Sequence, residues 1–259
     1  MTIESPQGKD AHLDSFDTDT ADGTDGAVEL AQSVAQTNPS GEPIGQISAL
    51  EGTAFITRTD GVKVEASDGT PIFQGDMVET NGNGAVGITF ADESSFSLAE
   101  NGSMVIDEMV YDPTSQSGTS AISVAEGVFT FVSGQIAKTD VEAMTISTPV
   151  AVIGIRGTSG GGQAGSEGTA NTFSLFQDAS GSTGEMVITT QGGAETLSAP
   201  NQTTQITSAF IPPTKPITLP PAAVAKFYAK AAKVAPTKII TQPANDAGPT
   251  GDAGPTEGG

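Results

Sequence analysis

Residues 148–158 read Thr148-Pro149-Val150-Ala151-Val152-Ile153-Gly154-Ile155-Arg156-Gly157-Thr158. An apolar run follows Pro149 in this stretch, and one arginine, Arg156, lies between Gly154 and Gly157. A short apolar run bounded by Pro and Gly is typical of a buried strand. The glycines allow the backbone to approach other strands closely, and the guanidinium has five donors and no acceptor. We therefore expect a strand that ends in a loop, with Arg156 either bridging strand ends or contacting a ligand or partner.

A glycine-rich run follows this strand, at residues 160–165, and matches the spacing G-x-G-x-x-G. That spacing binds dinucleotide phosphates only where a strand leads into the turn and a helix follows, because the helix N-terminus supplies amides and a dipole. Here residues 166–176 have the pattern of a loop and a strand, and no lysine follows the glycines. We expect a flexible loop and no phosphate site.

The segment 44–210 has the pattern of an all-β domain. Apolar and small residues alternate in short runs, which Gly, Asp and Asn turns separate. Asp60-Gly61 lies between two such runs and indicates a hairpin, because this pair tolerates positive φ. Period two and 32 glycines favour β structure, and the pattern is compatible with a twisted roll, a solenoid-like stack or a sandwich alike. The runs predicted as strands are 53–58, 62–66, 85–90, 95–98, 124–132, 143–147, 171–176, 185–190 and 203–208.

The chain is strongly acidic, with 31 Asp and Glu against 10 Lys and Arg and a net charge of -21. Residues 1–43 are acidic with only one Lys, and residues 236–259 repeat the sequence Asp-Ala-Gly-Pro-Thr. Segments so poor in apolar residues cannot offset the entropy lost on ordering, so both are predicted to be disordered tails. A chain with this negative net charge is not expected to bind nucleic acid, because the phosphate backbone is also negatively charged.

Cysteine is absent, which excludes disulfides, thiolate metal sites and thiol catalysis. The sequence has no run of 18 apolar residues, so no membrane span is expected. The first residues, from Met1 to Pro6, lack the basic region and the apolar run of a signal peptide. Two localisations are compatible with these features: export to the cell surface or the medium by a non-classical route, and residence in the cytoplasm.

One helix is predicted, over residues 222–235, after a Pro-rich spacer at 211–221. Pro220-Pro221 stands at its start and Pro236 just beyond its end, as is usual for helix boundaries. The basic face of this helix is either solvated, on a docked or tethered helix, or it binds a partner or the acidic remainder of the chain. We expect an apolar face of Val224, Phe227, Ala231 and Val234, and a basic face of Lys226, Lys230 and Lys233.

The sequence offers little for catalysis. The single histidine, His12, lies in the acidic tail, whereas a catalytic triad or a zinc site needs a histidine held beside other reactive or ligating groups. Because the chain has 31 Asp and Glu residues, close carboxylate pairs are expected by chance and do not indicate acid–base catalysis. The sequence has no calcium-loop motif, so we expect at most weak calcium binding. We predict no enzyme activity and no cofactor. The carboxylates of the middle domain that could do acid–base work are Asp76, Asp92, Asp107 and Glu108.

Several separated motifs, in order over residues 44–160, resemble the FecR domain family. The motifs are 45–47 (GQI), 50–52 (LEG), 58–61 (RTDG), 71–80 (PIFQGDMVET), 88–98 (ITFADESSFSL), 127–129 (GVF) with Gly134, and 146–149 (ISTP) with 154–158 (GIRGT). The resemblance implies a twisted all-β roll or a solenoid-like stack. Our candidate structural or partner-contact residues are Arg156, Gly154, Gly157, Thr158, Pro149, Asp76 and Asp92.

The best-known members of that family are inner-membrane regulators that relay a receptor's signal to a sigma factor. This chain lacks their membrane span and more closely resembles FecR-type modules of non-classically exported bacterial surface proteins, on residues 97–104, 107–113, 131–137 and 185–189.

The first hypothesis is a non-enzymatic structural or interaction module of an envelope-associated or secreted protein. The second is a soluble FecR-type signalling regulator that senses a receptor or ligand, through a β-edge near residues 150–170, and modulates gene expression. Both imply a protein partner or a cell-envelope component, and the oligomeric state is left open.

Overall fold

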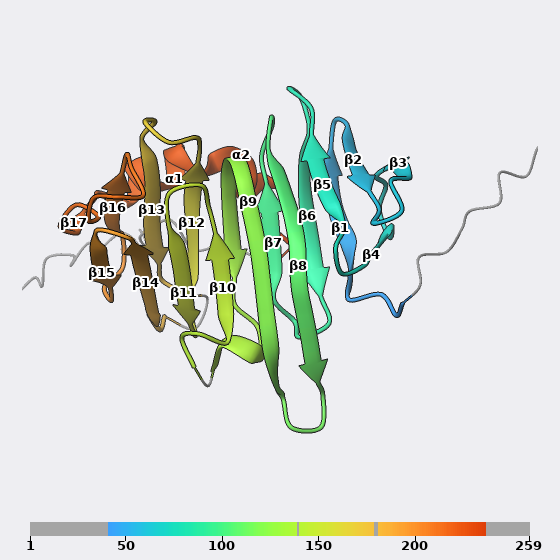
Figure 1. Ribbon diagram of the computed structural model, residues 1–259, viewed down its shortest axis with the longest axis horizontal. Coiled ribbons are helices and arrows are strands. Elements are labelled where there is room, and N and C mark those ends of the chain that lie inside the picture. The colour runs from blue at the N-terminus through green and yellow to red at the C-terminus, as the bar shows by residue number, and fades with distance from the viewer. Residues whose placement is uncertain (1–40, 139, 179–180, 237–259) are drawn as a thin grey trace, which may run out of the picture. The chain divides into compact units, whose positions relative to one another are not determined.

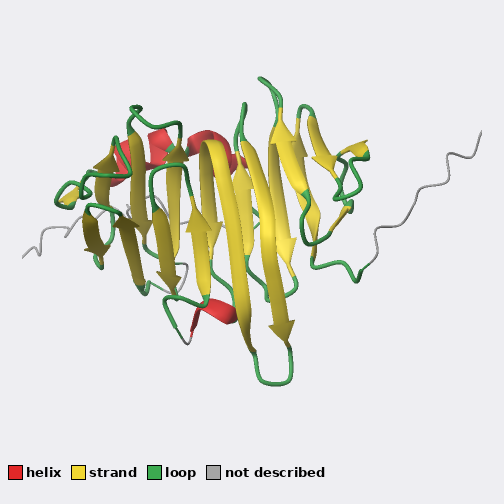
Figure 2. Cartoon of the chain, viewed as in Figure 1, coloured by secondary structure: helices red, strands yellow, loops and turns green. Residues whose placement is uncertain are grey.

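The computed structural model describes residues 41–138, 140–178 and 181–236. These residues belong to one compact unit. Within them the chain forms seventeen strands, one 3-10 turn (η1, Ile136–Lys138) and two short α-helices. The all-β fold class expected from the alternating pattern is confirmed (Figure 2). The tails predicted to be disordered fall outside the described residues, apart from 41–43 and Pro236.

The strands form two sheets that share one long strand, β9 (Ser117–Val132). Sheet A consists, in spatial order, of β4 (Pro71–Ile72), β1 (Gly45–Glu51), β6 (Ala85–Phe90), β7 (Ser95–Leu98), the second half of β9, β12 (Ser159–Ala164), β13 (Asn171–Phe176), β16 (Gln202–Ile206) and β17 (Ile217–Thr218). Sheet B consists of β3 (Lys63–Glu65), β2 (Ala54–Thr57), β5 (Met77–Thr80), β8 (Ser103–Asp112), the first half of β9, β10 (Met144–Ser147), β11 (Val152–Arg156), β14 (Glu185–Thr190) and β15 (Gly193–Leu197).

Successive hairpins alternate between the two sheets, so the chain advances steadily along them (Figure 1). β6–β7 lie in sheet A, β10–β11 in sheet B, β12–β13 in sheet A and β14–β15 in sheet B. Among the described strands the pairs are antiparallel, apart from β9 and β10, which run parallel. The fold therefore combines two of the expected architectures: it has two packed layers and a solenoid-like advance.

β9 carries the chain from one sheet to the other. Its residues up to Glu126 pair with β8, and Ser120 to Ser123 also pair with β10, in sheet B, whereas Gly127 to Val132 pair with β12 in sheet A. The register to β8 shifts at Ala125, which is a β-bulge, and Gly127 has a φ of 114°. Residues other than glycine rarely adopt that conformation. Bulge and glycine together bend the strand at the corner between the sheets.

The core lies between the sheets and takes side chains from both, in one continuous cluster. Phe96 of β7 and Phe129 of β9 stack with their ring centroids 5.3 Å apart. The period-two pattern of the sequence supplies these inward positions, because alternate residues of a strand face opposite sides of the sheet. Sheet A contributes Ile47, Val86, Ile88, Leu98, Phe131, Phe173 and Leu175, and sheet B contributes Ile56, Val78, Met104, Ile106, Ile122, Ile146, Ile153 and Ile188.

The glycine run after β11 is not the flexible loop that we expected. It forms most of β12, a buried strand between β9 and β13. A Cβ on Gly162 would lie 2.5 Å from the Phe129 ring and 2.7 Å from the Phe173 ring. A Cβ on Gly160 would lie 2.8 Å from the Phe131 ring. The glycines are therefore required by the aromatic side chains of neighbouring strands.

The predicted helix is present as two short helices at the outer face of sheet A (Figure 1). α1 is Pro221–Phe227 and α2 is Ala229–Lys233, and the chain bends between them at Tyr228. Tyr228 takes the buried place that we predicted for Phe227, whose side chain stays 43% exposed. The buried residues of this segment are Val224, Tyr228, Ala231 and Val234.

Candidate functional site

A row of small residues crosses the outer face of sheet A. Residues directly opposite each other on adjacent strands share a face, and the strand registers align six of them. A Cβ on the first of these, Gly87, would lie 2.0 Å from the Val234 carbonyl oxygen, so the helical segment lies close to the sheet backbone here. The six buried residues are Gly87, Ser97, Thr130, Gly161, Ser174 and Thr203, on β6, β7, β9, β12, β13 and β16.

Tyr228 anchors the helices on this row. Its ring lies so close to Gly161 that a Cβ there would come within 2.8 Å, and it packs edge-on to Phe176 with the ring centroids 5.1 Å apart. Its hydroxyl donates to the Gly161 carbonyl oxygen at 3.2 Å and lies 3.1 Å from Ser174 Oγ. Burial raises the pKa of Tyr228, and the hydrogen bond with Ser174 opposes that rise. The hydroxyl is therefore neutral at physiological pH and serves as an anchor.

Two ion pairs hold the basic face of α2 on the domain: Lys230 pairs with Glu100 and Lys233 with Glu51. The hydrogen bond from Lys230 lowers the pKa of Glu100. Because both lysines are largely exposed, each pair contributes at most about 1 kcal/mol. We considered a solvated basic face, a partner-binding face and a face that binds the acidic remainder of the chain. These contacts match the last of the three.

Replacing Tyr228 with alanine should release α1 and α2 from the sheet, because it removes both the ring over Gly161 and the hydroxyl contacts. Amide hydrogen exchange over 224–234 should then rise by about tenfold or more, while the core strands keep their protection. Tyr228→Phe is the matched control, since it loses only hydrogen bonds worth about 1 kcal/mol and should keep the helices docked. Unchanged exchange in the alanine variant would show that other contacts hold the segment.

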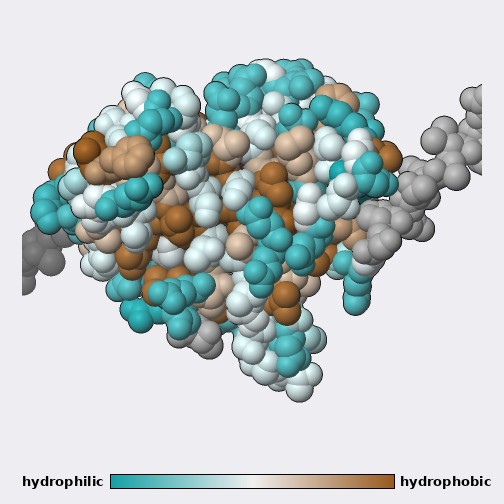
Figure 3. Space-filling view, viewed as in Figure 1, coloured by the Kyte–Doolittle hydropathy of each residue, from teal (hydrophilic) through white to brown (hydrophobic). Residues whose placement is uncertain are grey.

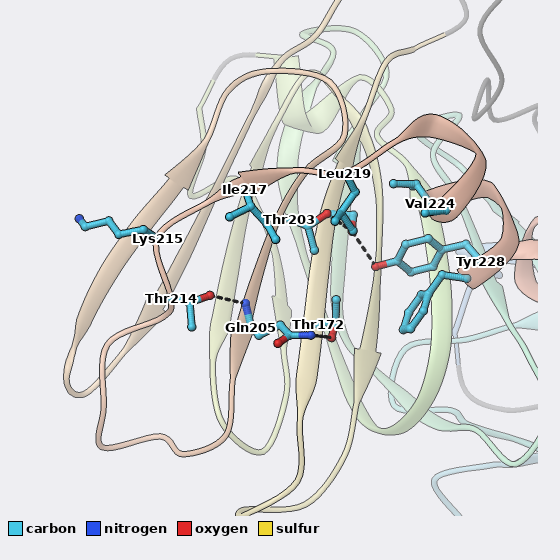
Figure 4. A pocket seen from close by; sticks show the side chains of 12 residues that line it. Thr172, Thr203, Gln205, Thr214, Lys215, Ile217, Leu219, Val224 and Tyr228 are labelled. Atoms are coloured by element: carbon cyan, nitrogen blue, oxygen red, sulfur yellow. Dashed lines mark hydrogen bonds between the residues drawn. The ribbon is translucent and has the colours of Figure 1, made fainter.

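A cavity of about 450 Å³ opens beside Tyr228, between α1, the segment 214–219 and strands β13 and β16 (Figure 4). Lys215 at its rim pairs with Glu195 at 2.7 Å. Hydroxyls, an amide and apolar side chains can hold a neutral ligand, but the lining residues offer no nucleophile beside a general base. The polar wall consists of Thr172, Ser174, Thr203, Gln205 and Thr214, and the apolar wall of Ile217, Leu219, Ala223, Val224 and Phe227.

Asp92, one of the residues that we singled out from the sequence, fastens the loop 133–138, which connects β9 to β10. The carboxyl is fully buried, and its Oδ1 accepts hydrogen bonds from the amide of Ser94, at 3.0 Å, and from its hydroxyl. Oδ2 accepts from the Ile136 amide at 3.4 Å, and the Asp92 carbonyl oxygen accepts from the Gln135 amide at 2.9 Å. Asp92 thus ties the β6–β7 turn to the loop.

Gly157 and Thr158 hold the same loop from another side. The Gly157 amide donates to the Ala137 carbonyl oxygen at 2.9 Å, and its φ of 54° lies in the left-handed region that favours glycine. The Thr158 amide donates to Ser133 Oγ at 2.8 Å, and the Thr158 carbonyl oxygen accepts from the Ser133 amide at 3.0 Å. The fold therefore brings Asp92, Gly157 and Thr158 together around one loop, where their contacts are structural.

Asp76 lies elsewhere, in the turn before β5, and its side chain is 1% exposed. Its Oδ2 accepts from the Phe73 amide at 2.7 Å and pairs with the Arg58 guanidinium, which lies over the Phe73 ring, 5.0 Å from the centroid. Burial raises the pKa of Asp76, and the Phe73 amide and Arg58 oppose that rise. These contacts close the turn.

Arg156 lies at the end of β11, on the surface, and bridges two strands. Its Nη2 is 3.4 Å from a carboxylate oxygen of Glu185, the residue directly opposite on β14. Gly154 lies within β11, where a Cβ would come 2.8 Å from the Val141 carbonyl oxygen. The strand-bridging alternative for Arg156 is the one that matches this geometry.

The strands that follow the exposed Pro149 are internal to their sheets. β11 pairs with β10 and β14, and β12 pairs with β9 and β13. The open β-edge that the second hypothesis, the signalling regulator, places near residues 150–170 is therefore absent from these two strands.

Replacing Arg156 with alanine should change the free energy of unfolding by less than about 1 kcal/mol, because its side chain is 53% exposed and its pair is solvent-screened. Denaturant unfolding in low and high salt would measure this, and the small difference should vanish in high salt. Glu185→Ala is the matched control and should behave alike. A loss of 2 kcal/mol or more, about what a buried acceptor left unpaired costs, would contradict an exposed pair.

Sequence reasoning missed Tyr228 as the anchor of the helical segment. The signal was present, since Val224, Tyr228 and Ala231 follow the i, i+4, i+7 spacing of one helix face. It also missed the first half of β9 and several whole strands, namely β1, β4, β5, β8, β12, β15 and β17.

Within the described ranges, no group of three or more His, Asp or Glu side chains is arranged to hold a metal ion. None of the helices found there is both long and apolar enough to span a membrane.

Residues 76–179 match the family model described as FecR protein. This segment is similar to the FecR family, and the match covers less than half of the chain. The matched range begins at the buried Asp76 and includes the β9 corner, the loop 133–138 and β12, so the resemblance drawn from the motifs is confirmed. The motifs between residues 45 and 61 lie ahead of it.

The comparison with curated proteins found no match. Among solved structures, a candidate anti-sigma factor from Parabacteroides distasonis is similar, with 15% sequence identity over 59% of this chain and a TM-score of 0.43. The similarity covers 63% of that protein's chain, which is less than two thirds.

Proposed function

We propose that this chain is a non-enzymatic interaction module, acting outside the bacterial cytoplasm in an envelope-associated or secreted protein, whose FecR domain binds a protein partner. The observation that carries the proposal is the FecR match over residues 76–179. The structure supports it in one respect: the polar residues selected from the motifs hold turns and loops in place, as in a rigid platform.

A soluble signalling regulator is the second candidate. The same match supports it, because the family resemblance includes regulators that relay a receptor's signal to a sigma factor. The two candidates differ in where the protein works and in what it binds.

Localisation of the full-length tagged chain tests the proposal. Intact cells would be treated with an external protease, and cells, envelope and medium would be probed separately. We expect the tag in the envelope fraction or the medium, with any surface-bound protein accessible to the protease. Recovery only from the cytosol, with a sigma factor or a receptor in chemical cross-links, would overturn the proposal in favour of the signalling regulator.

A further inference from the structure

The hairpin of β8 and β9 extends beyond the strands beside it (Figure 1). β8 pairs with β9 as far as Asp112, whereas it pairs with β5 only over Ser103–Val105. Backbone bonds from the Gly75–Asp76 turn extend the contact on the β5 side to Ile106. Among the described strands, residues 107–112 therefore have a partner on one side only. Such an edge presents backbone N–H and C=O groups and is a template for a further strand.

The open edge starts at a β-bulge. The register between β8 and β9 shifts between Ile106 and Glu108, so Asp107 is an extra residue on β8. Beyond the bulge, Met109 is buried and Val110 is 55% exposed, which shows that the alternation of the strand continues. Residues 108–112 therefore form a regular strand edge, which is long enough to pair with a short segment of another chain.

A cavity of about 430 Å³ adjoins this edge. Its lining is mixed, with slightly more polar than apolar surface, so it can take a side chain that an added strand directs toward the domain. The hairpin contributes Met109, Tyr111 and Pro113 to the lining, and the opposite side consists of Glu42, Pro43, Ile44 and Ala91.

The charge of the hairpin selects the partner. From Ser103 to Val132 the sequence has four carboxylates and no Lys, Arg or His, and Glu42 adds a carboxylate at the cavity. Hydrogen bonds from the Ser115 hydroxyl and the Thr114 amide lower the pKa of Asp112, so this carboxylate is ionised at neutral pH. The hairpin projects from the domain with a mostly hydrophilic tip (Figure 3). The carboxylates are Asp107, Glu108, Asp112 and Glu126.

Like charges directly opposite each other destabilise a strand pair, and opposite charges stabilise it. A second copy of this edge would bring carboxylates against carboxylates. We propose that residues 107–112 of β8 bind an extended, basic segment of a partner protein, which adds to sheet B as a strand. Alternate side chains of that segment face the carboxylates of the hairpin and the cavity. The inference rests on the proposed function and names the surface and the chemistry of the partner.

Defined peptides test the proposal on the full chain. The probe is a fluorescent, capped hexapeptide of alternating lysine and valine, and the two comparison peptides replace the lysines by glutamates or the central valine by proline. Proline keeps the charge but removes a backbone donor and interrupts the ladder. We expect anisotropy to report binding of the lysine–valine peptide in low salt, and weaker binding, by about tenfold or more, of both comparison peptides. Amide exchange should slow over 107–112 on binding.

Two variants locate the site. Asp107→Lys with Glu108→Lys reverses the charge of the edge and should weaken binding by about tenfold or more, whereas Glu126→Lys, on β9 of the same hairpin, should change it by about twofold or less. Circular dichroism would confirm that both variants are folded. Equal binding of the proline peptide, equal binding to the double variant, or no binding in low salt would overturn the proposal.

The outcomes also separate this proposal from the proposed function. If the peptide fails to bind while a partner is captured outside the cytoplasm, the β8 edge is wrong and the interaction module stands. If the peptide binds at the edge while the protein is confined to the cytosol, the edge stands and the proposed location is wrong.

Discussion

Replacing Asp92 with alanine should lower the free energy of unfolding by about 3 kcal/mol. The substitution removes the carboxylate that accepts from the amide and the hydroxyl of Ser94 and from the amide of Ile136, in a fully buried site. Loss of the acceptor of a buried donor such as the Ser94 amide costs about 1–3 kcal/mol. The loss should be large because the loop that Asp92 fastens connects the two sheets at β9 and β10. Urea unfolding followed by circular dichroism would measure it.

The neighbouring residue provides the control. Glu93 accepts a hydrogen bond from the Gln135 side chain at an exposed site, so Glu93→Ala should cost less than about 1 kcal/mol. Asp92→Asn keeps the shape of the side chain and one acceptor oxygen and should fall between the two. If the Asp92→Ala protein unfolds at the same urea concentration as the parent, Asp92 does not hold the loop 133–138 in the way described above.

Replacing Gly162 with valine should destabilise the domain by about 3 kcal/mol, because overpacking a core forces side chains off their rotamers and shifts the backbone. Even a Cβ at this position would lie 2.5 Å from the Phe129 ring, which is buried and stacks on Phe96. The midpoint of urea unfolding measures the effect. Gly82→Ala is the control, since a Cβ there meets only Asn101 Oδ1, at 3.5 Å, and should cost little.

A second substitution tests the cause. Phe129→Leu in the Gly162→Val background should recover part of the loss, because it removes the ring that the valine would meet. A double-mutant cycle should therefore show coupling of about 1 kcal/mol between the two positions. Strict additivity would mean that the valine acts through backbone conformation and not through contact with Phe129.

The sequence by itself determined the fold class and most of the strands. Runs such as Ala85–Phe90, Asn171–Phe176 and Glu185–Thr190 are predicted and observed with the same bounds. The hairpin at Asp60-Gly61 is also where it was predicted, with Gly61 at a φ of 84°. These features depend on local properties, since alternation places apolar side chains on one face and a turn needs particular backbone angles. The ordered motifs indicated the similarity to the FecR family in the same way, and the family model matches residues 76–179.

Only the tertiary structure decided the rest. β12 is a strand although its sequence is mostly glycine, because aromatic rings from β9 and β13 occupy the space that side chains would need. Tyr228 is the anchor because a row of small residues from six strands leaves room for its ring. The strand that carries Arg156 is internal to its sheet, and residues 107–112 of β8 form an open edge, because of pairings between distant segments. The physical reason is common to these cases: which space is free, and which strand lies alongside, depends on residues far away in the sequence, and no local pattern records it.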